Sequence, residues 1–181
     1  EENDKILQDE NIIINDDNTQ TLDRKYGKVE IVWIDENNNV IENPLSPYLG
    51  NLTPVKFNSS KSTFEQTAEN DAEWYNYDNQ RWANAINADG SYFVWIPRFA
   101  YRIVYYSNSD YSKVIGYSDG RGLLKLNEDG TFTRITKNNT GIRETSNHYI
   151  VAPAFSKDTA SWYRNGGWNK DLTGIWVAKY E

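Results

Sequence analysis

Residues 91–106 read SYFVWIPRFAYRIVYY and give the strongest secondary-structure signal in the chain. β-branched and aromatic side chains dominate this segment, and both kinds favour strands. A helix is disfavoured because Pro97 lacks the N–H group that a helix needs. We therefore predict two strands, or one bent strand, hinged at Pro97 and Arg98. A proline inside a strand belongs at a sheet edge or at a bulge.

Outside this segment, similar patterns predict further short strands joined by turns. Residues 28–34 (KVEIVWI) and 40–41 flank an Asp- and Asn-rich turn, which is typical of a β-hairpin with a longer loop. Residues 123–126 and 131–135 flank the turn sequence NEDG and predict a second hairpin. We predict a mainly β fold, α+β with little helix. Its other expected elements are strands at 55–57, 148–155 and 172–180, an aromatic hairpin pairing 74–77 with 80–83, and loops at 58–72 and within 110–122.

The expected domain organisation is an N-terminal arm over 1–27 followed by one mostly β domain over 28–181. The arm is polar and acidic except for Ile12-Ile13-Ile14, an apolar run that could act as a donated strand. The domain is either complete or lacks its C-terminal part.

Composition excludes several classes of function. The chain has 181 residues, 19 Lys and Arg against 26 Asp and Glu, and a net charge of −7. This balance argues against nucleic acid as a partner, because phosphate neutralisation needs clustered cations. The absence of Cys excludes disulfides, thiol nucleophiles and Cys-ligated metals. No run of about 18 apolar residues is present, so we expect no membrane span within these residues.

Several segments together resemble a known group of proteins. They are WID at 33–35 with ENP at 42–44, LTPV at 52–55, WYNY at 74–77 with WANA at 82–85, FVWIPRFAY at 93–101, YIVAPAF at 149–155 and LTGIWVAKYE at 172–181. Their order resembles uncharacterised surface proteins of Gram-positive bacteria and prophages, many with a prepilin-like N-terminus. Those proteins carry a domain similar to the formylglycine-generating-enzyme (sulfatase-modifying factor) superfamily, a variant of the C-type-lectin fold.

The resemblance covers roughly residues 28–181 and implies the start of such a domain, preceded by a β-hairpin region. The resemblance does not imply the catalytic activity of that superfamily for this chain. The generating enzyme uses a cysteine pair, and this chain has no Cys. A related iron-dependent branch uses several histidines, whereas this chain has one and places Ala152 where a histidine would be expected. In that superfamily the strand resembling 176–181 opens the domain, and much more sequence follows it.

We therefore expect a non-catalytic, extracellular structural protein at the cell surface, a subunit of a bacterial filament or pilus-like assembly. An apolar strand that needs burial can pair with a neighbouring chain, and strand donation is one way in which pilus subunits assemble. The candidate assembly strands contain Ile12, Ile13 and Ile14 in the arm and Ile175, Trp176 and Val177 near the end. Self-association is the expected partnership.

The alternative is an adhesion function, as a carbohydrate- or receptor-binding module of a bacterial surface or phage tail protein. Exposed aromatic rings beside Asn and Asp can stack on sugar rings while amides bind hydroxyls, so a glycan or host surface is the expected partner. If both candidate strands pair within one chain, this alternative gains over the filament. The candidate binding residues are Trp162, Tyr163, Trp168, Trp74, Tyr77 and Trp82.

An enzyme is the third hypothesis and the weakest. His148 is the single imidazole, and neighbouring Ser146 lacks a nucleophile-elbow pattern. Glu73, near Trp74, is the best glycosidase candidate by its surroundings. We expect no cofactor and no metal site. Calcium is the one ion that the acidic loops could bind, through Asp110, Asp119 and Asp129, although no segment has the EF-hand spacing.

Overall fold

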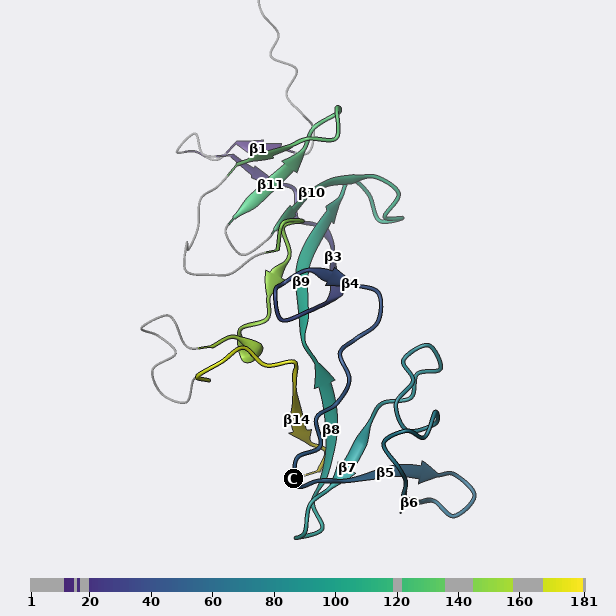
Figure 1. The fold of residues 1–181 in the computed structure, drawn as a ribbon. Helices are drawn as coiled ribbons and strands as arrows, with labels where there is room; N and C mark the ends of the chain where they lie inside the picture. The colour runs from purple at the N-terminus through teal and green to yellow at the C-terminus, as the bar shows by residue number, and fades with distance from the viewer. Residues whose placement is uncertain are drawn as a thin grey trace, which may run out of the picture. The chain divides into compact units, whose positions relative to one another are not determined.

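The computed structural model describes residues 12–14, 16, 20–118, 122–135, 145–157 and 168–180. This part of the chain is mainly antiparallel β-structure with essentially no helix (Figure 1). Its one helical element is the single 3-10 turn η1 (Pro153–Phe155). The strands are β1 (Ile12–Ile14), β2 (Gln20–Leu22), β3 (Tyr26–Ile34), β4 (Val40–Ile41), β5 (Thr53–Asn58), β6 (Thr63–Gln66), β7 (Asn84–Ile86), β8 (Tyr92–Pro97), β9 (Phe99–Tyr106), β10 (Val114–Ser118), β11 (Leu123–Leu126), β12 (Phe132–Arg134), β13 (Ile150–Val151) and β14 (Gly174–Ala178).

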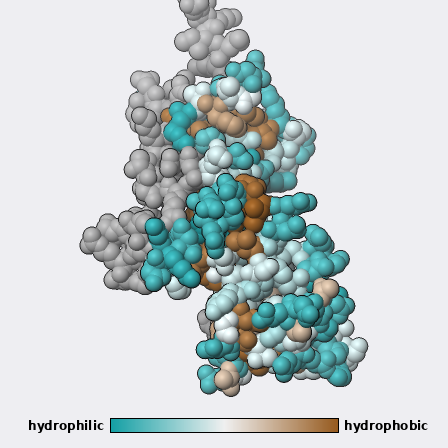
Figure 2. Space-filling view, viewed as in Figure 1, coloured by the Kyte–Doolittle hydropathy of each residue, from teal (hydrophilic) through white to brown (hydrophobic). Residues whose placement is uncertain are grey.

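Two large sheets and a small hairpin contain these strands. The seven-stranded sheet has the order β12-β11-β10-β9-β3-β4, and β13 pairs with β9. The five-stranded sheet has the order β14-β8-β7-β5-β6, so β14 and β6 form its edges. β1 pairs with β2, with Ile12 opposite Leu22. Hydrophilic residues cover most of the described surface seen in Figure 2.

The chain divides into two compact units. The first unit combines residues 1–32 with 100–151, and the second combines 33–99 with 152–181. The boundaries therefore fall inside β3, directly after Phe99, the first residue of β9, and directly after Val151, the last residue of β13. The arm over 1–27 and the domain over 28–181 stay a prediction.

In the first unit, Leu22 of β2 packs into a core with Tyr105, Ile115 and Leu123. Gly116 of β10 makes this packing possible. A Cβ atom there would lie 2.5 Å from the Leu22 Cδ1 atom and 2.2 Å from a backbone carbonyl oxygen. The segment expected to be an arm thus contains β1 and β2, paired with each other, and Leu22 lies in the core of its own chain.

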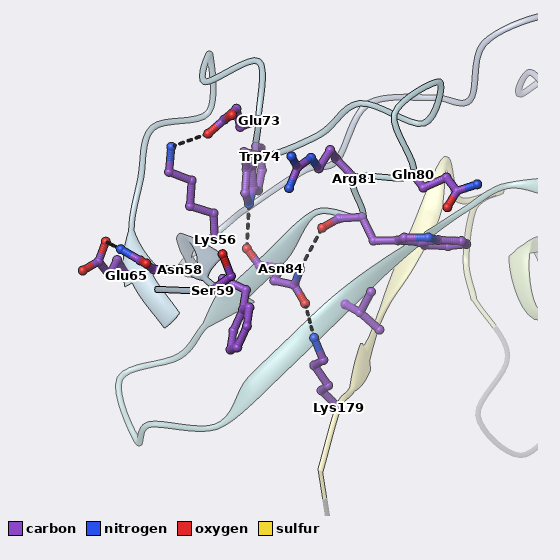
Figure 3. Close-up of a pocket in the computed structure, with 13 residues that line it drawn as sticks. Lys56, Asn58, Ser59, Glu65, Glu73, Trp74, Gln80, Arg81, Asn84 and Lys179 are labelled. Atoms are coloured by element: carbon purple, nitrogen blue, oxygen red, sulfur yellow. Dashed lines mark hydrogen bonds and ion pairs between the residues drawn. The ribbon is translucent and has the colours of Figure 1, made fainter. Parts of the chain in front are cut away.

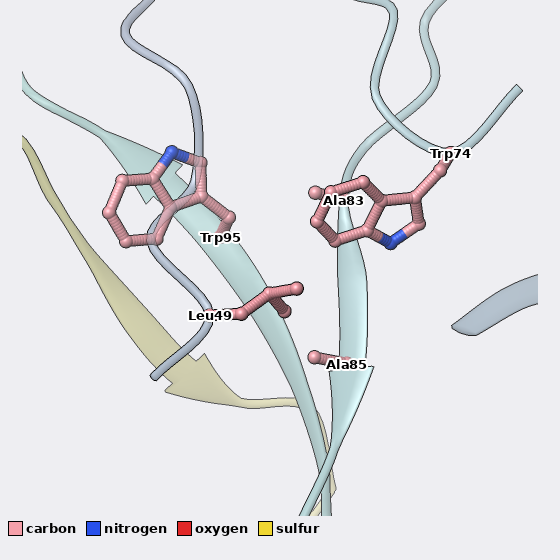
Figure 4. Close-up of a cluster of buried hydrophobic side chains, with 5 residues drawn as sticks. All are labelled: Leu49, Trp74, Ala83, Ala85 and Trp95. Atoms are coloured by element: carbon pink, nitrogen blue, oxygen red, sulfur yellow. The ribbon is translucent and has the colours of Figure 1, made fainter. Parts of the chain in front are cut away.

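In the second unit, two buried indole rings form the core with Leu49 and two alanines (Figure 4). Trp74 and Trp95 are 3% and 2% exposed. Ala83 and Ala85 are two residues apart and share one face of the chain at β7, where their small side chains leave room for the rings. Aromatic rings fill this core because the sequence supplies few aliphatic residues.

The strongest strand signal is confirmed. Residues 91–106 form β8 and β9, which meet at Pro97 and Arg98. The β3–β4 and β11–β12 hairpins are also confirmed, and the predicted final strand is present as β14.

Two local predictions are wrong, and a third is confirmed only in part. The 58–72 loop contains β6, which pairs with β5 at the sheet edge. The 110–122 loop contains β10. The aromatic hairpin that pairs 74–77 with 80–83 is confirmed in part. Asn76 and Arg81 form an antiparallel bridge in the predicted register, but this single bridge takes the place of two paired strands.

Candidate functional site

A fully buried arginine organises one side of the second unit. The Arg98 guanidinium donates hydrogen bonds from Nη1 to the carbonyl oxygens of Phe155 (2.9 Å) and Leu172 (3.3 Å). Its Nε donates to the Asp35 carbonyl oxygen at 3.2 Å, and Nη2 donates to Asn38 Oδ1 at 2.7 Å. Arg98 thereby joins the turn after β3, the η1 turn and the loop that enters β14.

The turn after β3 is itself closed by a carboxylate. Asp35 accepts hydrogen bonds from the side-chain amide of Asn39 (2.9 Å) and from the N–H groups of Asn39 and Asn37 (both 2.8 Å). These bonds, led by the side-chain amide, lower the pKa of Asp35. Asn38 has a φ of 67°, a left-handed conformation that asparagine tolerates. The turn presents Glu36 at the surface.

Next to this turn lies a hollow of about 990 Å³, here called the tryptophan hollow. Trp95, Trp168 and Trp176 line it, and each indole N–H donates to a backbone carbonyl oxygen at 2.8–3.2 Å. These bonds fix the rings, of which Trp95 is 2% exposed and belongs to the core of the unit. The complete lining is Glu36, Tyr48, Trp95, Trp168, Lys170, Asp171, Leu172, Thr173, Gly174, Ile175 and Trp176.

The tryptophan hollow combines ring surface with hydrogen-bonding groups. Trp168 is 45% exposed and Tyr48 is 77% exposed. Glu36, Lys170 and Asp171 supply carboxylates and an ammonium group at the same hollow. Binding sites for small molecules typically pair such apolar surface with a few placed polar groups. This arrangement can bind a ligand that has both an apolar face and hydroxyl groups.

A second hollow of about 810 Å³, here called the charged hollow, lies in the same unit (Figure 3). Within it the Lys56 ammonium pairs with Glu73 at 3.3 Å and, beyond the lining, with Asp71 at 2.7 Å. Glu65 accepts a hydrogen bond from the amide of Asn58. The lining is Lys56, Phe57, Asn58, Ser59, Glu65, Glu73, Trp74, Gln80, Arg81, Trp82, Asn84, Val94 and Lys179.

The structure distributes the predicted binding residues over three environments. Trp168 lines the tryptophan hollow, and Trp82, 44% exposed, lines the charged hollow. Trp74 reaches the charged hollow but is a core residue, with its N–H donated to the Asn84 carbonyl oxygen. Tyr77 packs against Trp82 with ring centroids 4.9 Å apart. Trp162 and Tyr163 lie outside the described residues.

The predicted assembly residues are paired within their own chain where they are described. β14 forms antiparallel pairs with β8, from Gly174 opposite Pro97 to Ala178 opposite Phe93. Ile175 and Trp176 line the tryptophan hollow, and Val177 is 42% exposed. The assembly role of these strands stays a prediction.

Among the described candidates for catalysis and metal binding, Glu73 is the one that lines a hollow. His148 packs against Phe132 in the first unit, with ring centroids 5.6 Å apart. Asp110 and Asp129 each accept hydrogen bonds within their own loops, and Asp119 lies outside the described residues. Within the described ranges, no three His, Cys, Asp or Glu side chains gather closely enough to hold a metal ion. Nor does any helix there reach the length and apolarity needed to cross a bilayer.

Sequence reasoning missed several residues at the hollows. Arg98 carries a usable signal, because a cation inside an apolar strand run must find buried partners. Tyr48 follows Pro47 in an irregular connector, where no periodic pattern places a side chain. Arg81 and Lys179 give no sequence signal, since isolated cations in a turn region or just after a strand are usual surface residues.

Comparisons of this chain with protein-family models, curated proteins and solved structures found no match.

Proposed function

We propose that this chain is a non-catalytic carbohydrate-binding module that binds a sugar in the tryptophan hollow. One observation carries the proposal. Three indole rings, each fixed through its N–H group, line one hollow together with a largely exposed tyrosine and three charged side chains. Indole rings bring a large apolar surface, and fixing them in advance reduces the ordering cost of binding.

The chemistry of a pyranose ring suits this lining. The C–H face of the sugar would lie against the exposed Trp168 ring, and its hydroxyls would meet Glu36, Lys170 and Asp171. The Asp171 carboxylate already accepts the Lys157 N–H at 2.7 Å, which holds it in place. Trp95 and Trp176, whose ring centroids are 5.4 Å apart, also line the hollow.

The sequence resemblance supports an extracellular, non-catalytic protein of this kind. The chain resembles bacterial surface proteins with a domain similar to the formylglycine-generating-enzyme and C-type-lectin scaffold. Without Cys and with one His, it cannot supply the residues that those enzymes use. We therefore propose a binding or adhesive role at the cell surface or on a phage particle.

The test is a glycan array read with labelled protein, followed by titration of the best neutral sugar. We expect Trp168→Ala to weaken this binding about tenfold or more, the loss typical of a central aromatic anchor. Tyr111→Ala is the matched control, because Tyr111 is also a partly exposed ring (39%) but belongs to the first unit. Unchanged affinity for Trp168→Ala, with melting temperature retained, would refute the proposal.

A filament subunit is the second candidate, supported by the edge position of β14. β14 pairs with β8, and no other described strand pairs with it. Its Val177 is 42% exposed, which leaves an edge that a second copy could extend. Sedimentation and negative-stain imaging would show multimers for the parent chain and loss of them in Val177→Lys. A parent chain that stays monomeric at high concentration would exclude this function.

A further inference from the structure

One edge of β3 is open along most of its length. β9 pairs with one side of β3, and β4 pairs with the other side at Trp33 and Ile34. Along residues 26–32, which belong to the first unit, no described strand pairs on the β4 side. Val29 and Ile31 are 62% and 58% exposed there, more than any other described Val, Leu or Ile. An uncovered edge with apolar side chains is a template for pairing with another strand.

The backbone groups at this open edge come from alternate residues. The Asp35 N–H donates to the Asn39 carbonyl oxygen at 2.9 Å across the β3–β4 turn, so the odd-numbered residues direct their backbone groups to the β4 side. When this alternation is continued along the strand, Gly27, Val29 and Ile31 each present an N–H and a C=O at the open edge. Their side chains share one face of the sheet. The edge therefore offers both the hydrogen-bonding groups and the apolar side chains that a partner strand needs.

Two charged side chains lie on the opposite face of the same segment, and both are held in place. Glu30 Oε2 accepts hydrogen bonds from Arg102 Nε at 2.8 Å and from the Tyr149 hydroxyl at 3.2 Å. The Lys28 ammonium group lies 3.7 Å from the centre of the Tyr111 ring. Lys28 and Glu30 are two positions apart in the strand, so their side chains share a face. A lysine on an exposed edge usually discourages strand pairing, so a partner strand must offer it a carboxylate.

We propose that two copies of this chain pair through the open edges of β3 as an antiparallel dimer centred on Val29. In this register Val29 lies opposite Val29 of the second copy, and Gly27 lies opposite Ile31. Lys28 of each copy then lies opposite Glu30 of the other, a favourable cross-strand pair. A shift of two residues in either direction would place Lys28 opposite Lys28, or Glu30 opposite Glu30, and like charges directly opposite each other destabilise a sheet. Charge complementarity therefore selects the register centred on the midpoint of the open segment.

This dimer goes beyond both functions proposed above. It uses β3 in the first unit, whereas the two hollows and β14 belong to the second unit. The same edge of each copy forms the interface, so the pairing is closed by a twofold axis and does not continue into a filament. The occupant of the edge is a second copy because the segment is self-complementary in hydrogen bonds, apolar side chains and charge.

A single introduced cysteine tests the register, because the chain contains no Cys of its own. In the proposed dimer the two Val29 Cα atoms are about 5.5 Å apart, the spacing of a hydrogen-bonded antiparallel pair. A disulfide spans this distance. Ile31 lies opposite Gly27 of the second copy, so the two Ile31 Cα atoms are about 13 Å apart along the strands. Under mild oxidation we expect Val29→Cys to form a disulfide-linked dimer on a non-reducing gel, and Ile31→Cys to remain uncrosslinked.

Ile31→Cys is the matched control, since Ile31 and Val29 are almost equally exposed and random collisions would crosslink both variants. In sedimentation equilibrium the parent chain should be a dimer. Val29→Lys, which places two ammonium groups opposite each other, should be a folded monomer by circular dichroism. Val177→Lys, at the β14 edge, should leave the dimer intact. A monomeric parent chain, equal crosslinking of the two cysteine variants, a dimer that persists in Val29→Lys, or a dimer lost in Val177→Lys would each overturn the proposal.

Discussion

Replacing Arg98 by methionine tests how the walls of the tryptophan hollow are held. The variant keeps side-chain bulk but removes the donors of four hydrogen bonds, one of them buried and three part-buried. The two shorter bonds, to the Phe155 carbonyl oxygen (2.9 Å) and to Asn38 Oδ1 (2.7 Å), should account for most of the lost stability. A buried acceptor left without its partner costs about 1–3 kcal/mol. Relief from burying the guanidinium offsets part of the loss, so we expect a net destabilisation of about 4 kcal/mol.

For a chain of this size, that loss corresponds to a melting temperature lower by roughly 8–16 °C. Thermal melting followed by near-UV circular dichroism reports on it, because the indole rings of the hollow give that signal. Arg24→Met is the matched control on an exposed arginine and should stay within about 0.5 kcal/mol of the parent. If Arg98→Met melted within 2 °C of the parent, the proposed anchoring would be refuted.

Two further changes test the second unit. In Gly174→Ala, the new Cβ would lie 2.3 Å from the buried Trp95 ring and 2.6 Å from the Ile96 carbonyl oxygen, so we expect about 3 kcal/mol of destabilisation in urea titrations. A neutral effect would contradict the packing. The hydrogen bond from Lys56 lowers the pKa of Asp71 below its ordinary 3.8. The ionised Asp71 carboxylate therefore stabilises the fold fully at pH values well above 3.8, and this stabilisation is lost as the pH falls below 3.8. The melting difference between the parent and Asp71→Asn should be constant from pH 5 to 8 and shrink below about pH 4; an undiminished difference at pH 3 would refute the pair.

The strands that the sequence predicts well are those with dense β-branched and aromatic content. Residues 91–106 and 28–34 combine this content with clear breaks, so hydrophobic pattern and local propensity agree. The sequence does not predict β6 because Phe64 is its one apolar residue. One apolar side chain is enough here because β6 is an edge strand. That ring packs between Phe57 and Tyr92, contacts that bring together distant parts of the chain.

β10 was missed for a different reason. Its Gly116 indicates a turn in a local interpretation, whereas the structure needs glycine there for close contact with the Leu124 carbonyl oxygen and Leu22. The position is decided by tertiary packing, which no window of sequence contains. The same holds for Trp74, since alternation along the chain cannot tell which face of an aromatic segment becomes the core.

The sequence predicts which residue types form the candidate site, but not which residues the fold brings together there. Aromatic content pointed to Trp168 and Trp82, and both are about half exposed at a hollow. Their partners come from distant segments. The Trp176 indole N–H donates to the Tyr48 carbonyl oxygen across 128 positions of sequence, and Arg98 donates to the Leu172 carbonyl oxygen across 74. Such convergence depends on strand order, which single-sequence patterns do not specify.

The position of β14 constrains how the two candidate functions could coexist. Trp176 lines the tryptophan hollow and is opposite Trp95 in the β8 pairing. If β14 were donated to another subunit, its chain would lose this indole and the hollow with it. Donation and sugar binding by one subunit's own residues would then exclude each other. Addition of a strand to the side of β14 that no described strand pairs with would leave the hollow intact. A filament that assembles through β14 and still binds sugar must therefore do so by edge addition, and in it Val177→Lys should abolish assembly while sugar affinity is kept.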